Sequence, residues 1–349
     1  MARRLSVDGI SVAAGEKKVI DLNIARLVSG TKIDLPVHVF RSKKAGPIVL
    51  LSGGLHGDEV DGVEVIRRLI RNKTFDKLKC GSVIAIPVLN IYGFLNFSRE
   101  VPDGKDVNRF FPGSKNGSLA ARVAYNITTK VLAEIDFGID FHTGGANRYN
   151  YPQSRFAAED SRAREIAEVF NAPISLESGL IDKSLRKEAY KMGKSIVVFE
   201  GGEAMRFDEL SIQEGIRGAK RVLAHYGMID EGESLQNSTH CTQSQWIRAK
   251  RSGLFQSLVK SGEWVDEKDV IAYISDPFGS KQIKIKSPAS GIIIGHNNAP
   301  VVNQGDAVLV LVLSSSVMSD DNNLLAPCPN SPNCVSSLSG SKDHWVPPL

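Results

Sequence analysis

Hydrophobic residues follow two alternating patterns along the chain. Short continuous apolar runs, such as residues 48–52, are typical of strands that are buried on both faces of a sheet. After each run, apolar residues return every three or four positions, as in an amphipathic helix. The patterns predict strands over 48–52, 82–88, 135–141 and 194–199, and helices over 60–70, 118–134, 160–170 and 209–226.

The alternation of strands and helices predicts an α/β fold, with a mostly parallel mixed sheet flanked by helices. Residues 1–45 are expected to form strands that pack on a main domain spanning 46–230. After a polar linker, residues 240–314 combine short apolar runs with Gly-Glu, Asp-Pro and Ser-Gly turns, which predicts a smaller all-β domain. Residues 315–349 are polar and rich in proline, and they are predicted to be a disordered tail.

Composition narrows the class of protein. Of the 349 residues, 42% are hydrophobic and 23% are charged, and charges of both signs are mixed to a net +4. No basic run with aromatics indicates nucleic acid, and no apolar run could span a bilayer or form a signal peptide. Four scattered cysteines give no disulfide framework. We therefore expect a cytoplasmic protein with reduced thiols and with no nucleic-acid or membrane partner.

Candidate metal ligands lie where predicted strands end. His56 and Glu59 follow the first strand in GGLHGDE, and His142 follows a later strand in DFHTGG. Zinc favours such ligands, and catalytic zinc usually has three protein ligands and a water. A lone histidine is more often structural, but two in this setting predict one Zn2+ site made by His56, Glu59 and His142. Asp140 is a candidate to orient His142.

Other polar residues are candidates for catalysis and binding. Glu200 ends the last predicted strand before two glycines, where a carboxylate is costly unless it has a role, so it is the candidate general base. A helix cap or an ion pair is its alternative role, and Glu203 is close enough to be confused with it. In DVNRFFPG, Arg109 with Asn108 could bind a substrate carboxylate through two parallel hydrogen bonds. Arg99 lies in the same long loop.

Four segments in order, GGLHGDE, DVNRFFPG, DFHTGG and FEGGE, resemble the succinylglutamate desuccinylase and aspartoacylase family of the zinc carboxypeptidase superfamily. The resemblance spans about residues 35–315 and is close in style to bacterial deacetylases of acetylated diaminobutyrate. RYNYPQ at 148–153 resembles the loop after the third ligand in that subgroup. The resemblance implies that His56, Glu59 and His142 bind zinc and that Asn108 and Arg109 bind the substrate. It also implies that Glu200 is the general base and that Arg99 is a further arginine of the site.

These features predict a zinc-dependent deacylase that cleaves the amide bond of a small N-acyl amino acid or N-acyl diamine. A substrate carboxylate is expected, but the resemblance does not fix the acyl group or the amine. Two alternatives stay open. One is a zinc carboxypeptidase that acts on peptides in a longer, open cleft. The other is a binding or scaffold protein that has kept the fold without activity.

The predicted β domain resembles the barrel-sandwich fold of lipoyl and biotinyl carriers. Its region DPFGSK at 276–281 lacks the Met-Lys pair of a carrier, so we predict no attached cofactor. A role at the mouth of the pocket is expected, or a contact between subunits through an exposed β edge. In the tail, Cys328, Cys334 and His344 provide one ligand fewer than a closed zinc site needs, and no metal is predicted there.

Overall fold

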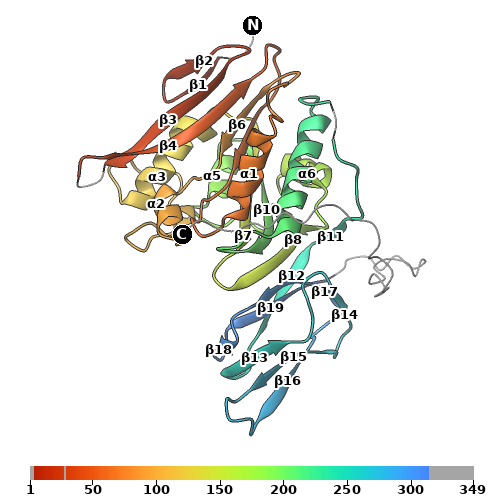
Figure 1. The fold of residues 1–349 in the computed structure, drawn as a ribbon. Coiled ribbons are helices and arrows are strands. Elements are labelled where there is room, and N and C mark those ends of the chain that lie inside the picture. The colour runs from red at the N-terminus through yellow and green to blue at the C-terminus, as the bar shows by residue number, and fades with distance from the viewer. Residues whose placement is uncertain (1–3, 27–28, 231, 314–349) are drawn as a thin grey trace, which may run out of the picture. The chain divides into compact units, whose positions relative to one another are not determined.

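The protein is described here by a computed structural model covering residues 4–26, 29–230 and 232–313 (Figure 1). Its main element is a 13-stranded mixed sheet. Across this sheet the strands follow the order β12 (Gln243–Arg248), β19 (Ala307–Leu313), β17 (Gly291–Asn297), β8 (Arg148–Phe156), β10 (Ser195–Glu203), β7 (Phe137–Gly144), β5 (Ile48–Ser52), β6 (Ser82–Ile86), β4 (Lys32–Arg41) and β3 (Lys17–Arg26). Off this path, β9 (Ile174–Glu177) pairs with β8 and β11 (Thr239–Cys241), and β14 (Trp264–Val265) pairs with β17.

The four central strands, β10, β7, β5 and β6, run parallel, so several strands end at the same edge of the sheet. The register places Ser52 opposite Asp140 and Glu200 opposite His142. The predicted α/β class, with helices around a mixed sheet, is confirmed. Segments that follow the carboxyl ends of neighbouring parallel strands must lie close together, and this is where sites form in such sheets.

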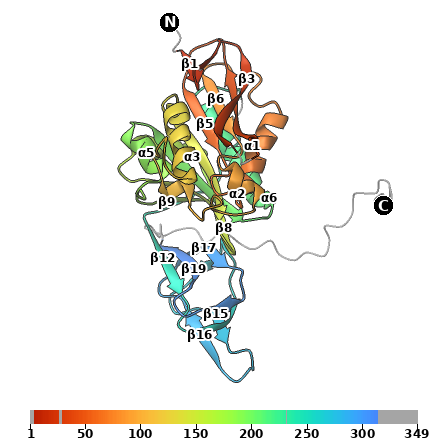
Figure 2. The same cartoon turned by 90° about the vertical axis from the view of Figure 1, so that its left-hand side faces the viewer.

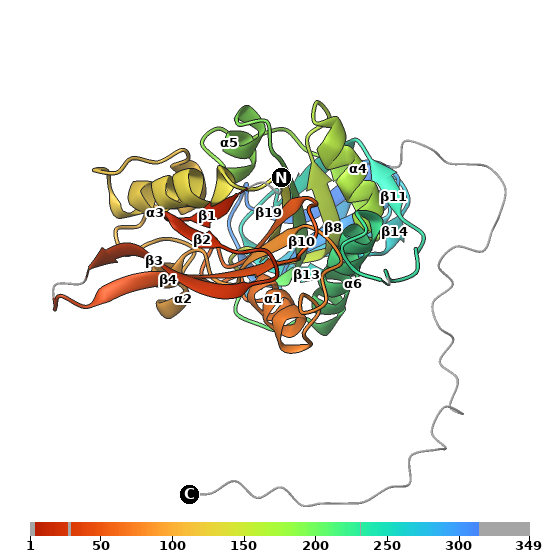
Figure 3. The same ribbon diagram turned by 90° about the horizontal axis from the view of Figure 1, so that it is seen from above.

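Successive residues of the central strands face opposite layers of helices, which explains their continuous apolar character. Ile48 and Leu50 of β5 pack in one core, and Val49 and Leu51 pack in the other. The two layers lie on opposite sides of the sheet when it is seen from above (Figure 3). The first core includes α3 (Leu119–Ile127) and α5 (Leu185–Lys191), and the second includes α1 (Asp61–Arg71), α4 (Ser161–Phe170) and α6 (Glu209–His225).

The local patterns predict these central elements well and the shorter ones poorly. The helix expected over 118–134 begins at α3, where the Ser118 side chain accepts a hydrogen bond from the backbone N–H of Ala121. It continues as a π-helical segment, Thr128–Leu132, instead of a regular α-helix. The pattern missed α5, α2 (Ile91–Leu95) and the 3-10 turn Val107–Arg109, each too short for a clear helical period.

The expectation of a loop over 148–153 is wrong, because these residues begin strand β8. This strand is antiparallel to β10 on one side and to β17 on the other. Its sequence RYNYPQSRF contains proline, arginines and amides, so it lacks the apolar run of a buried strand. Its own sequence does not predict a strand, and pairing with the neighbouring strands stabilises one here.

Residues 239–313, here called the C-terminal β region, form a sandwich with its own apolar core. One layer is a four-stranded antiparallel sheet of β16 (Gln282–Lys286), β15 (Val270–Ser275), β13 (Gly253–Ser257) and β18 (Val301–Val302). The other layer contains β12, β19 and β17, and β17 pairs with β8, so the main sheet continues into this region (Figure 2). The described residues form one compact unit, and domain boundaries near 45 and 230–240 stay predictions.

At the N-terminus, a separate hairpin pairs β1 (Leu5–Val7) with β2 (Ile10–Val12), while β3 and β4 extend the main sheet beyond β6. The predicted disordered tail and its residues Cys328, Cys334 and His344 lie outside the described residues. Within the described part of the chain, no helix has the length and apolar character needed to cross a membrane.

Candidate active site

The loop between β5 and α1 carries His56 and Glu59, and Gly57 fixes its path. The Gly57 backbone N–H donates to the carbonyl oxygen of Ser98 at 3.0 Å. A Cβ atom at Gly57 would lie 1.8 Å from the backbone carbon of Gly93, so no larger residue fits. This close approach of two backbones explains the glycine in GGLHGDE.

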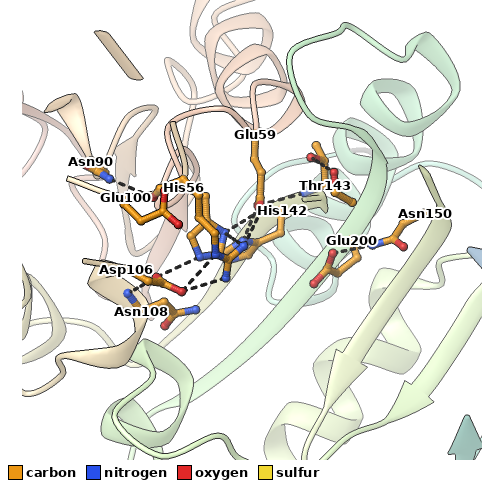
Figure 4. A network of polar contacts seen from close by, with 12 residues as sticks. His56, Glu59, Asn90, Glu100, Asp106, Asn108, His142, Thr143, Asn150 and Glu200 are labelled. Carbon is orange, nitrogen blue, oxygen red and sulfur yellow. Dashed lines mark hydrogen bonds and ion pairs between the residues drawn. The ribbon is translucent and has the colours of Figure 1, made fainter. Parts of the chain in front are cut away.

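His56, Glu59 and His142 come together at the carboxyl ends of β5 and β7 (Figure 4). The Nδ1 atom of His56 lies 2.7 Å from Oε1 of Glu59, and Nδ1 of His142 lies 2.7 Å from Oε2 of the same carboxylate. All three side chains are buried, and one ligand atom from each lies within 4.8 Å of the others. The two imidazoles therefore present the same nitrogen, Nδ1, to one point.

The opposite nitrogen of each imidazole faces another carboxylate. Nε2 of His142 lies 2.8 Å from Oδ2 of Asp140, whose Oδ1 accepts a hydrogen bond from the Ser52 hydroxyl at 2.7 Å. Nε2 of His56 lies 3.3 Å from Oδ1 of Asp106. Metal-binding histidines usually have such a partner behind them, because it fixes the orientation of the ring. The sequence pointed to Asp140 in this role but not to Asp106.

The electrostatics of the cluster depend on pairing between buried groups. Burial alone would lower the pKa of both histidines, but the carboxylates that face them outweigh this effect. The pKa of His56 is therefore raised, and the pKa of His142 is raised well above its ordinary value. Burial raises the pKa of Glu59, but His56 and His142 outweigh it and hold this pKa far below its usual range. Because bound histidine must be neutral, protons compete with a metal ion for this site.

This donor set fits a zinc ion. Two imidazole nitrogens and one carboxylate converge, a further carboxylate lies behind each ring, and all three residues line the cavity. That arrangement matches a catalytic zinc site, which keeps one coordination position for water or substrate.

The long loop before α3 places its predicted residues around the cluster. Nη1 of Arg99 lies 3.1 Å from Nδ1 of His56 and 3.3 Å from Oε1 of Glu59. Asp106 holds this arginine through Nε at 3.2 Å and Nη2 at 3.0 Å. Asn108 accepts a hydrogen bond on its side-chain oxygen from the backbone N–H of Leu185 at 2.8 Å, so its amide donor remains for the cavity. Arg109 also lines the cavity, and 44% of its side chain is exposed.

Glu200 lies in the same cavity, on β10 beside His142. Its Oε2 accepts a hydrogen bond from Nδ2 of Asn150 at 2.8 Å, and its Oε1 lies 3.7 Å from Nη1 of Arg155. Oε2 of the carboxylate is thus held by a hydrogen bond, and Oε1 has no hydrogen-bond donor among the described contacts. Glu203, the residue that sequence could not separate from Glu200, instead accepts a hydrogen bond from Asn298.

The cavity has a volume of about 440 Å³, and it is lined by every residue that was predicted to bind the metal, bind substrate or act in catalysis. Five arginines and two glutamates, Glu59 and Glu200, line it. Among the lining residues that sequence reasoning did not assign to the cavity are five with long polar or aromatic side chains: Arg148, Asn150, Arg155, Arg186 and Trp246. Three of these lie on β8, so a correct strand prediction there would have pointed to them.

Arg186 and Trp246 come from segments far from the metal ligands in sequence. The Arg186 guanidinium donates to the Ser178 hydroxyl at 3.0 Å and to the Gly179 carbonyl at 2.7 Å. Burial and the neighbouring Arg155 lower the pKa of Arg186 to about 10. Trp246 lies on β12 of the C-terminal β region, with the Arg148 guanidinium 5.3 Å from the centre of its ring. This region therefore forms part of the cavity wall.

The geometry agrees with the match of residues 45–226 to the family model described as Succinylglutamate desuccinylase/Aspartoacylase catalytic domain. The chain belongs to this family. The N-alpha-acetyl-L-2,4-diaminobutyric acid deacetylase of Halomonas elongata is 27% identical over 298 residues, covering 79% of this chain and 85% of that protein. Family membership and this relative support hydrolase activity on a small N-acyl compound.

Solved structures share the fold. A succinylglutamate desuccinylase/aspartoacylase of Rhodobacter sphaeroides has a TM-score of 0.77 at 26% identity, covering 86% of this chain and 95% of its own. The product-bound ectoine utilization protein EutE (DoeB) of Ruegeria pomeroyi has a TM-score of 0.78 at 23% identity, covering 85% and 95%. Both matches extend beyond the catalytic domain of residues 45–226, since each covers 85% or more of this chain.

The contacts of Asp106 predict its role in metal binding. Asp106→Asn should weaken zinc affinity by roughly 10- to 100-fold, as for other groups that orient metal-binding histidines. Competition titration with a zinc chelator measures this loss. Asp103→Asn is the matched control, because Asp103 lies in the same loop and pairs only with exposed Lys105 in the described contacts. Equal zinc affinity in the two variants would contradict a role for Asp106 behind His56.

Proposed function

We propose that the protein is a zinc-dependent deacylase that hydrolyses the amide bond of a small N-acyl amino acid. The observation that carries the proposal is the convergence of His56, Glu59 and His142 within 4.8 Å, in a cavity that also contains Glu200. In this proposal His56 and His142 bind zinc through Nδ1, and Glu59 binds it through its carboxylate. Bound zinc would polarise the attacking water and the amide carbonyl.

The remaining steps fall to residues of the chain. Glu200 accepts the proton of the attacking water on its open oxygen and later gives it to the leaving amine. The Arg99 guanidinium, held by Asp106 beside the ligands, donates to the oxyanion that develops on the substrate carbonyl. Asp140 and Asp106 keep both imidazoles in place while charge moves at the centre of the site.

The charge of the cavity supports a substrate with a carboxylate. Five arginines face two carboxylates, and both carboxylates already have roles, as metal ligand and as base. A small anionic compound would pair with the guanidinium groups away from the metal, with Arg109 and the amide donor of Asn108 as its anchor. The Halomonas relative is a deacetylase of an N-acetylated amino acid, a compound of this class.

The wall formed by the C-terminal β region favours small substrates over peptides. Trp246 lines the cavity on this side, with the Arg148 guanidinium 5.3 Å from the centre of its ring. A carboxypeptidase needs an open path for the chain that precedes the scissile bond. The bulky ring on this side supports a deacylase instead.

Replacing the proposed base gives the first test of mechanism. Glu200→Gln should lower kcat by about 10²-fold or more, because an amide cannot accept the proton, while zinc content stays normal. Turnover of an N-acetyl amino acid and metal analysis measure the two effects. Glu203→Gln is the matched control and should keep near-normal turnover. A Glu200→Gln enzyme with near-normal kcat would remove this residue from the mechanism.

The proposed anchor predicts a dependence on the substrate carboxylate. Arg109→Lys keeps the charge but loses the two-pronged geometry, so kcat/KM for a free carboxylate substrate should fall by a free-energy equivalent of about 2 kcal/mol or more. The same substrate with that carboxylate amidated should be poor for both enzymes. If the wild-type enzyme processes the free and amidated compounds equally well, Arg109 does not bind a carboxylate.

The indole wall predicts the size limit of the substrate. Trp246→Ala should raise the ratio of kcat/KM for N-acyl dipeptides over N-acyl amino acids by about 10-fold, because it opens the cavity by the volume of a ring. Trp264→Ala, in the same β region but away from the cavity, should leave the ratio unchanged. Identical ratios in the wild type and the Trp246 variant would show that another feature sets the limit.

A further inference from the structure

Strand β8 connects the strand that carries Glu200 to the C-terminal β region. Near its start, Asn150 pairs with Gly202 of β10 on one side and with Gly295 of β17 on the other. Both cross-strand partners of Asn150 are thus glycines, so neither adds a side chain beside its amide. A Cβ atom at Gly295 would lie 3.1 Å from Oδ1 of Asn150, which shows how closely β17 approaches this amide.

Glu200 lies where the regular pairing of β10 ends. The register with β8 shifts between Glu200 and Gly202, and the register with β7 shifts between Glu200 and Glu203. Such bulges re-aim side chains, and they are common next to active sites. Backbone pairing therefore does not by itself fix the direction of this carboxylate beyond the bulge, and a side-chain contact must do so.

The Asn150 amide makes that contact. Its Nδ2 donates to Oε2 of Glu200 at 2.8 Å, and Figure 4 shows the two side chains reaching toward each other across adjacent strands. The nearest cation, Nη1 of Arg155, lies 3.7 Å from Oε1, which is too far for a hydrogen bond. A neutral donor on one oxygen holds the carboxylate, and it leaves the lone pairs of the other oxygen for a proton.

We propose that Asn150 is a positioning residue that aims Glu200 at the attacking water, and that pairing with β17 of the C-terminal β region keeps Asn150 in place. The proposal rests on the function proposed above for Glu200. Proton transfer requires the base within about 3 Å of the proton it takes, and small misplacements lower the rate strongly. The C-terminal β region then does more than form a wall of the cavity, because it supports the strand from which the base is held.

The test is a double-mutant cycle. Asn150→Leu keeps the approximate size of the side chain and removes the donor. Glu200→Asp keeps a base but withdraws it from the reach of Asn150. In the wild-type background, Asn150→Leu should lower kcat by roughly 10-fold, with KM and zinc content within about twofold of normal. In the Glu200→Asp background, the same substitution should change kcat by less than about twofold, because the hydrogen bond is already lost.

Asn298→Leu is the matched control. It removes an equivalent hydrogen bond of 2.9 Å from an asparagine of the C-terminal β region to Glu203, and kcat should stay near normal. Normal kcat in Asn150→Leu would overturn the proposal. An equal loss of kcat in both backgrounds would also overturn it, because it would mean that Asn150 shapes the cavity independently of Glu200.

Failure of this proposal is separable from failure of the proposed function. If Glu200→Gln keeps near-normal turnover, the base is another group and both proposals fall. If Glu200→Gln is impaired but the cycle is additive, the deacylase mechanism stands and the role of Asn150 alone is rejected.

Discussion

One buried carboxylate, that of Glu59, organises the candidate site. Its two oxygens each lie 2.7 Å from an imidazole Nδ1, one from the loop after β5 and one from the end of β7. Burying three ionisable side chains is unfavourable unless each has a partner of opposite charge or a metal ion. The adjacent parallel strands β5 and β7 provide this pairing, since their ends cannot separate without disrupting the sheet.

The Asp106 carboxylate, behind this cluster, restricts the conformation of the loop that carries Asn108 and Arg109. Burial raises the pKa of Asp106, but His56 and Arg99 outweigh it and hold the pKa well below its usual range, so the group stays ionised. It contacts His56 on one side and Arg99 on the other, which links the candidate metal ligands to the loop that carries Asn108 and Arg109. A loop of this length would otherwise sample many conformations, and ion pairs with a partly buried carboxylate restrict it.

The C-terminal β region has a closer relation to the site than its position at the end of the sequence suggests. It pairs with β8 through β17, and it contributes Trp246 of β12 to the cavity. Since β8 also carries Arg148, Asn150 and Arg155, part of the cavity wall depends on strands that pair across the boundary predicted near residue 240. Glu200 on β10 and the C-terminal strands therefore belong to one continuous sheet.

The sequence alone determined the central fold and the cluster of His56, Glu59 and His142. Continuous apolar runs mark β5, β6, β7 and β10 because both of their faces are buried, and ligands directly after such strands must meet at one edge of a parallel sheet. The segments GGLHGDE and DFHTGG therefore predicted a cluster that the structure contains.

Only the tertiary structure decided the rest of the cavity. Strand β8 lacks an apolar pattern, because Arg148, Asn150 and Arg155 face the cavity. Its pairing comes from β10 and β17, which are distant in sequence. Asp106, Arg186 and Trp246 carry no local signal either, since a charged or aromatic residue in a polar segment is ordinarily exposed to solvent. Their contacts arise from long-range pairing of strands and from packing of loops, and a local sequence pattern contains no information about which distant segment will lie beside it.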